Sequence, residues 1–164
     1  MITVMRGVGH QYNHTKPDKH VVSCDQLLCP SPYEADMNLR KSGLDWFREH
    51  HGPGDETRVS KFYPTHQSWK GPVWWFEFPD SAVSDPTGYI NLLCQHRNNP
   101  DSFHHLRVPM ALFGACKHHL GYREDNKKFS LFLSAERETL FREMRGTGNI
   151  EFRGFEHRCG ESIT

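Results

Sequence analysis

The chain has 164 residues, a length typical of one domain that buries a core without disulfides or metals. Its 20 Lys and Arg balance its 20 Asp and Glu, which excludes a globally basic nucleic-acid-binding protein but leaves room for a local basic patch. The 36% hydrophobic and 12% aromatic residues exclude intrinsic disorder over most of the chain. We therefore predict a single domain over residues 1–164, with a weakly patterned segment at 1–30 and a loose tail at 160–164.

The first residues, Met1 to Gly7, lack the features of a signal peptide, and no apolar run has the length of a membrane span. The five cysteines, an odd number, fit a reducing compartment. We expect a cytoplasmic protein without membrane contact, in which Cys94 and Cys116 are small core residues.

The first clear element is a helix from Pro32 to about His50. Ser31 at the N-cap and Glu34 three residues later form a capping box, and Pro32 suits the first helical position. Two short strands are expected before it, at 2–5 and 20–23. Gly52-Pro53-Gly54 then stops the helix, and residues 55–72 are expected to form a loop.

The strands are predicted from β-branched and aromatic content and from alternation, at residues 73–78, 89–95, 103–108, 129–133 and 150–155. Pro109 opens a short helix that Gly121 ends, and Ser134 caps a helix over Ala135–Arg145. These elements predict an α+β fold. One mainly antiparallel or mixed sheet of about five strands carries two or three helices on one face.

The familiar catalytic motifs, including a phosphate-binding glycine loop, a nucleophile elbow and a zinc-protease helix, are missing from the sequence. A metal-dependent nuclease pattern is present only in degraded form. Glu77 and Asp80 end one strand, but Gln95 and Arg97 replace the acid and the lysine expected on the next. Arginine stays protonated and does not serve as a tunable base.

Histidine is the unusual residue of this chain, with 12 copies that include three doublets. Imidazole is both a metal ligand and a general acid–base, so one interpretation places His96, His104 or His105, and His118 or His119 around a metal or a scissile phosphate. For any single histidine, a surface or helix-end role is favoured. Cys24 and Cys29 lack a second close cysteine pair, so we expect no stoichiometric zinc and no cofactor.

A basic and aromatic segment runs from Arg58 to Phe76 without an acidic residue. Cations attract phosphates and exposed aromatic rings stack on bases, which indicates nucleic-acid recognition. The competing interpretation places Trp74 and Phe76 in the core and the remainder in an ordinary loop.

Strand alternation places a polar and aromatic set on one sheet face: Trp75, Glu77, Tyr89, Asn91, Gln95, His105, Arg107, Glu151 and Arg153. Such a face is either solvated or a recognition surface, and its aromatic residues favour recognition.

Two functions follow. The first is a small binding module for nucleic acid or a protein partner, with these ligand-binding residues: Tyr63, Trp69, Lys70, Trp75, His105 and Arg107. The alternative is a small His-dependent or metal-dependent hydrolase, phosphodiesterase-like or nuclease-like, in which His96, His105, Glu77 and Arg107 carry the chemistry. The sequence specifies neither the ligand nor the oligomeric state. Convergence of imidazoles and carboxylates in one place favours the enzyme, and a flat aromatic and basic face favours the binding module.

Overall fold

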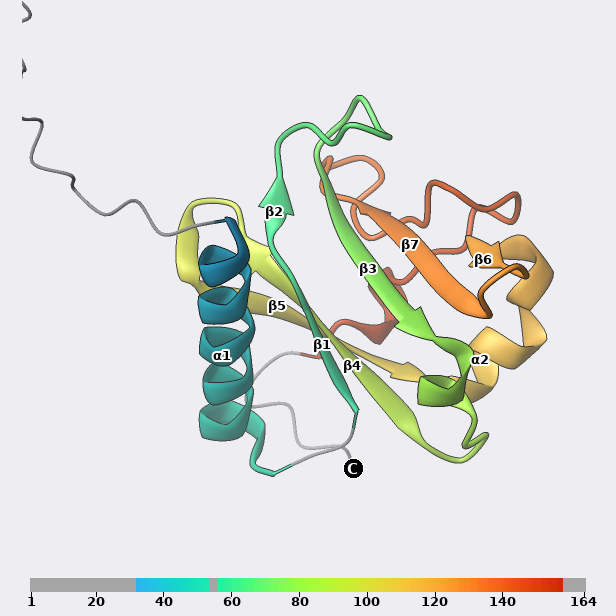
Figure 1. Ribbon diagram of the computed structural model, residues 1–164, viewed down its shortest axis with the longest axis horizontal. Coiled ribbons are helices and arrows are strands. Elements are labelled where there is room, and N and C mark those ends of the chain that lie inside the picture. Colours follow the sequence, from blue (N-terminus) through green and yellow to red (C-terminus); the bar gives the residue numbers. More distant parts are fainter. Residues whose placement is uncertain (1–31, 54–55, 158–164) are drawn as a thin grey trace, which may run out of the picture.

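The computed structural model describes residues 32–53 and 56–157, which form an α+β fold with two sheets (Figure 1). The first sheet has the order β1-β4-β5, with β1 at Thr57–Ser60, β4 at Tyr89–His96 and β5 at Asn99–Pro109. The second has the order β2-β3-β7-β6, with strands at Phe62–Tyr63, Val73–Pro79, Lys128–Ser134 and Tyr122–Arg123 in that order. Within these described residues, no helix is long and apolar enough to cross a membrane.

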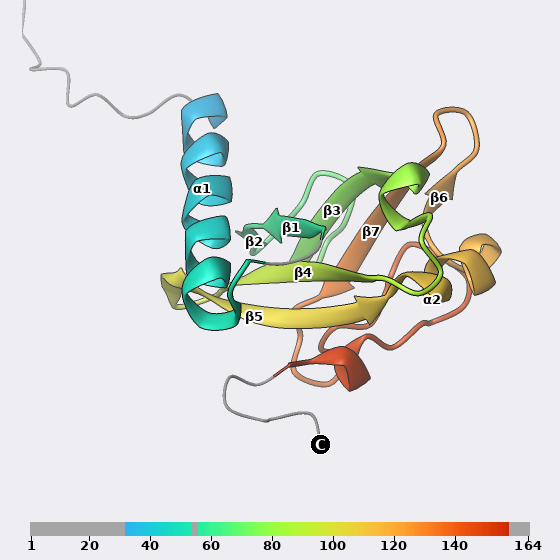
Figure 2. The ribbon, with the colours of Figure 1, turned by 90° about the horizontal axis from the view of Figure 1, so that it is seen from below.

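The predicted first helix is confirmed as α1, Pro32–His51, which covers the outer face of the first sheet (Figures 1 and 2). Its buried Phe47 packs with Leu93 of β4 and Phe103 of β5. Gly43 faces β1, because a Cβ at that position would lie 2.7 Å from Cγ1 of Val59. Glycine lowers the intrinsic helix propensity here, but it allows the helix and the strand to approach closely.

The main core lies between the two sheets. The inward-facing side chains of β3, β4 and β5 alternate as the sequence predicts, and they include Trp74, Phe76, Ile90, Leu92, Leu106 and Val108. Leu131 and Leu133 of β7 join them in the core. Cys94 is fully buried in this core, and Cys116 is half-buried against it. Cys24, Cys29, Cys159 and the short strands expected at 2–5 and 20–23 lie outside the described residues.

The segment expected to be a loop at 55–72 contains two strands instead. β1 pairs in parallel with β4, and β2 pairs antiparallel with β3, so the chain passes from one sheet to the other at Lys61. Side chains complete the backbone pairing at this crossing. Oγ of Ser60 accepts the Trp75 N–H at 2.9 Å, and Oε1 of Gln95 accepts the Phe62 N–H at 3.2 Å. Such short strands, supported by side chains from other elements, give no clear periodic pattern of hydrophobic residues in the sequence.

Four of the five predicted strands are confirmed as β3, β4, β5 and β7, but they belong to two sheets rather than one. The fifth, at 150–155, is wrong: only an isolated bridge at Glu151 and a 3-10 helix, η3 (Arg153–Phe155), occur there. The short helix after Pro109 is confirmed as α2, Met110–Ala115, followed by the 3-10 helix η2, Lys117–His119. A further 3-10 helix, η1 (Asp80–Val83), follows β3.

The helix predicted over Ala135–Arg145 is also wrong, because this segment follows β7 as irregular chain with isolated bridges. The reason is the buried carboxylate of Glu143. It accepts the N–H groups of Gly146 at 2.6 Å, Arg145 at 3.0 Å and Phe132 at 3.4 Å, which replaces helical hydrogen bonds with tertiary ones.

The two-sheet arrangement also divides the predicted recognition face. Because the sheets pack with their inner faces together, their outer faces belong to different sides of the molecule (Figure 2). Asn91, His105 and Arg107 lie on the first sheet, whereas Trp75 and Glu77 lie on the second. Helix α1 covers the first sheet, while α2 contributes Met110 and Phe113 to the main core, so the helices do not share one sheet face.

Candidate metal centre

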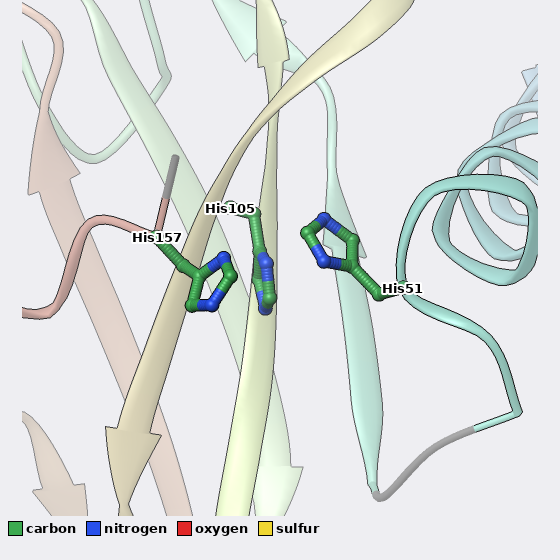
Figure 3. A group of neighbouring side chains, drawn as sticks. All are labelled: His51, His105 and His157. Atoms are coloured by element: carbon green, nitrogen blue, oxygen red, sulfur yellow. The ribbon is translucent and has the colours of Figure 1, made fainter. Parts of the chain in front are cut away.

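Three histidines that are distant in sequence converge beside the first sheet (Figure 3). His51 is the last residue of α1, His105 lies in β5, and His157 follows η3. One ligand nitrogen from each ring lies within 4.8 Å of the others, and the ring centroids are 4.4, 5.2 and 5.3 Å apart. Among the described residues, this is the one group of three or more His, Cys, Asp or Glu side chains with metal-ligand spacing.

The local fold explains how these residues meet. His105 pairs with Leu93 across β4 and β5, on the face that α1 covers, so the C-terminal end of the helix brings His51 over it. The chain after η3 runs along β5, where Glu156 bridges Leu106 and the His157 N–H donates to the His105 carbonyl oxygen at 2.8 Å. A helix end, a sheet strand and a short pairing segment therefore supply one imidazole each.

A buried asparagine sets the tautomer of His105. Oδ1 of Asn91 lies 2.8 Å from Nε2 of His105, and the two residues are only 2% and 3% exposed. Because an amide oxygen only accepts, Nε2 carries the proton and Nδ1 keeps its lone pair. The Nδ1 atoms of His105 and His157 are both buried, and neither has a hydrogen-bond partner in the described part of the chain. Buried polar atoms normally have partners, so these two nitrogens, unpartnered within the described residues, are available to a shared electron-pair acceptor such as a metal ion.

The surroundings favour the neutral form of two of these rings, His105 and His51. Burial, followed by repulsion from His51, His157 and Arg107, lowers the pKa of His105 to about 3. Burial also lowers the pKa of His51, with smaller contributions from His157 and His50. Neutral imidazole is the form that binds metal ions, so burial by the fold prepares His105 and His51 to act as ligands.

The donor set suits an ion such as Zn²⁺. Zinc–nitrogen bonds of about 2.0–2.1 Å in a tetrahedral site place ligand nitrogens roughly 3.3 Å apart. The ligand nitrogens of the three rings lie within 4.8 Å of one another, so they would approach by up to about 1.5 Å on binding the ion. Phe47 forms an apolar wall, edge-on to His105 at 5.3 Å and stacked on His51 at 5.2 Å. Structural zinc sites use four protein ligands, whereas catalytic ones use three and leave a position for water. The three imidazoles that the described residues supply therefore match the catalytic type.

The residues proposed as catalytic from the sequence are distributed over three places. His105 belongs to the centre, and Arg107 lies two residues further along the same strand face, with its guanidinium 3.8 Å from the Tyr89 ring centroid. His96 instead stacks on His104 at 4.9 Å, in a group that contacts Trp74. Glu77 is exposed on β3 and forms an ion pair with Lys128 at 3.0 Å.

The residues proposed for ligand binding fall into two groups. Tyr63 and Trp75 contact the ring of His66, and Trp69 and Lys70 line a cavity with it. His105 and Arg107 lie on the first sheet, as described above. The structure therefore brings four of the six together and places the other two at the histidine cluster.

Sequence reasoning missed His51 and His157. His51 belongs to a doublet at a helix end, where a histidine is favoured by the helix dipole and needs no further role. The high histidine count was the only signal, since no short spacing relates these positions. No protein-family model, curated protein or solved structure matches this chain.

Proposed function

We propose that this protein is a metal-dependent hydrolase whose divalent ion, of the Zn²⁺ type, is bound by His51, His105 and His157. The observation that carries this proposal is the convergence of three imidazoles, two of which have a buried Nδ1 atom without a hydrogen-bond partner among the described residues. The proposal takes up the alternative that the sequence left open, a metal-dependent hydrolase, in place of the binding module. Its ligand set differs from the one considered there, and it departs from the expectation that the chain holds no zinc.

The chemistry follows from the number of ligands. His51, His105 and His157 would hold a divalent ion and leave a position for water, and the bound ion would lower the pKa of that water to about 7, which would supply a nucleophile at neutral pH. In the hydrolysis, the water oxygen bonds to the electrophilic atom of the ester and the bond to the leaving oxygen breaks with its electron pair. One water proton passes to solvent, and the leaving oxygen takes up a proton. Asn91 acts as a positioning residue, because it holds His105 in the tautomer that exposes Nδ1.

Arg107 supports an anionic substrate. Residues two apart on a strand face are separated by about 6.6–7 Å, so its side chain starts close to the centre. No carboxylate in the described part of the chain pairs with Arg107, and the Tyr89 ring supports its guanidinium. A guanidinium without a carboxylate partner is available to a phosphate or carboxylate group. A phosphate diester therefore fits this site better than a neutral ester.

The test begins with metal binding. We expect the purified chain to bind about one Co²⁺, with the visible absorption of tetrahedral nitrogen coordination. His51→Gln and His157→Gln should abolish that spectrum, while His118→Gln, at an exposed histidine on η2, should leave it unchanged. The Zn²⁺-loaded or Co²⁺-loaded protein should hydrolyse bis(4-nitrophenyl) phosphate, and the two cluster variants should not.

Absence of cobalt binding, or equal binding by wild type and both cluster variants, would show that the cluster is not a metal centre. Stoichiometric binding without hydrolysis of the phosphate diester or of 4-nitrophenyl acetate would contradict the catalytic part of the proposal.

A further inference from the structure

A second candidate site lies at the tip of the second sheet, where a cavity of about 600 Å³ opens between the β2–β3 connection and the chain after β7. Cavities that hold small ligands commonly have volumes of about 300–1,000 Å³. Its lining includes His66, Trp69, Lys70, Gly71, Glu136 and Met144. None of these residues belongs to the histidine cluster, so the cavity needs its own explanation.

The aromatic wall of this cavity is held in place. The backbones of His66 and Trp69 exchange two hydrogen bonds of 3.1 and 2.9 Å, and the Ser68 N–H donates to Nδ1 of His66 at 3.1 Å. The His66 ring contacts Phe132 at 5.0 Å and Trp75 at 5.3 Å, which anchors this turn to the sheet. Trp69 is therefore half-buried on a turn that is held in place. Stacking a ligand on its ring would remove little further conformational freedom from the side chain.

Two polar groups meet beside Gly71. A Cβ on this glycine would lie 3.1 Å from Oε1 of Glu136 and 3.4 Å from Nε1 of Trp69, so the carboxylate and the indole approach the same point. Lys70 is exposed at the edge of the cavity. Within the described residues, neither Lys70 nor Glu136 forms a salt bridge. The cavity thus presents an anion and a cation that do not neutralise each other, next to an aromatic ring.

We propose that this cavity binds a guanine nucleotide, with the base stacked on Trp69, its N–H edge on the Glu136 carboxylate and its phosphate on Lys70. Every base offers a face for stacking, but guanine alone presents two adjacent N–H groups, which match the two oxygens of one carboxylate. A phosphate requires a cation, which Lys70 supplies. The ligand is either a free nucleotide or a guanine within a single strand, since both present the same groups.

Isothermal titration calorimetry at low salt tests this proposal with GMP, AMP and guanosine. We expect wild type to bind GMP more tightly than AMP. Trp69→Ala should weaken GMP binding by about 5- to 150-fold, the usual effect of losing one stacking platform. Trp69→Phe should retain most of the affinity, which separates stacking from folding. Glu136→Gln should remove the preference for GMP over AMP, and Lys70→Gln should weaken GMP but not guanosine.

Lys41→Gln and Glu138→Gln, at exposed positions on α1 and after β7, serve as matched controls and should behave as wild type. Failure of wild type to bind GMP, equal affinity for AMP and GMP, or full affinity in Trp69→Ala would overturn the proposal. Tighter binding of a guanine-containing single-stranded tetranucleotide than of GMP supports it and identifies a nucleic acid as the source, whereas equal affinity supports it with a free nucleotide as the source.

Discussion

Replacing Asn91 tests the arrangement that makes His105 a ligand. Asn91 is buried, and its Oδ1 is the acceptor for Nε2–H of His105 at 2.8 Å. Asn91→Leu keeps a side chain of similar size but leaves this N–H buried without an acceptor, which costs about 1–3 kcal/mol of unfolding free energy. His105 can relieve this cost by moving its proton to Nδ1 or by rotating, and either change removes the lone pair from the cluster. Loss of such an outer hydrogen bond lowers metal affinity by about 10- to 100-fold.

Asn91→Asp is the matched variant, because a carboxylate still accepts the Nε2–H bond. We expect it to keep metal affinity at or above that of wild type, since a carboxylate raises the basicity of the imidazole. The measurements are competition of Zn²⁺ with a chromophoric chelator and urea unfolding of the metal-free protein, read as a shift in midpoint at constant slope. Zinc affinity of Asn91→Leu within twofold of wild type would refute the reasoning that Asn91 sets the tautomer.

Three further predictions concern stability. Because the folded-state pKa of His105 is about 3, well below the unfolded value of about 6.5, its contribution is present at neutral pH and is lost as pH falls from 6.5 towards 3. Between pH 6.5 and pH 5, the unfolding free energy of metal-free wild type should therefore fall by about 2 kcal/mol more than that of His105→Gln, as measured by urea unfolding. Equal decreases in the two proteins would contradict this assignment. Glu143→Leu should lower the unfolding free energy by about 2–4 kcal/mol, because the Gly146 and Arg145 N–H groups lose their acceptor; an unchanged urea midpoint would argue against it. Gly146→Ala should cost about 1–3 kcal/mol in thermal or urea unfolding, because its Cβ would lie 2.0 Å from the His119 carbonyl oxygen, and a neutral effect would mean that the backbone there yields freely.

The elements that the sequence predicted correctly are those whose signals are local. Pro32 and the Gly52-Pro53 stop bound α1 within a few residues, and the β-branched and aromatic run at Val73–Phe78 became β3. Alternation also placed His105 and Arg107 together on one face of β5, and both are among the polar side chains in or beside the candidate centre. The periodicity of side chains and the capping of helices depend only on neighbours in the sequence, so both can be read without knowledge of the fold.

The segment after β7 shows where local signals mislead. Leu140, Phe141 and Met144 have helical spacing, and Ser134 is a good N-cap, yet no helix forms. Phe141 adopts a positive φ of 62°, and the carboxylate of Glu143 satisfies backbone donors from β7 and from its own loop. These bonds exist only once β7 is in place, so tertiary hydrogen bonding outweighs a modest helical propensity.

The sequence by itself determined the α+β class, the first helix, four of the strands and, for three of those strands, which side chains face the core. Only the tertiary structure decided that the strands form two sheets and that His51 and His157 join His105. The physical reason is the range of the interactions. Periodicity reports how each element divides its surface between core and solvent, whereas the histidine cluster depends on where a helix end and a C-terminal segment dock against β5, and those contacts join residues that are far apart in the chain.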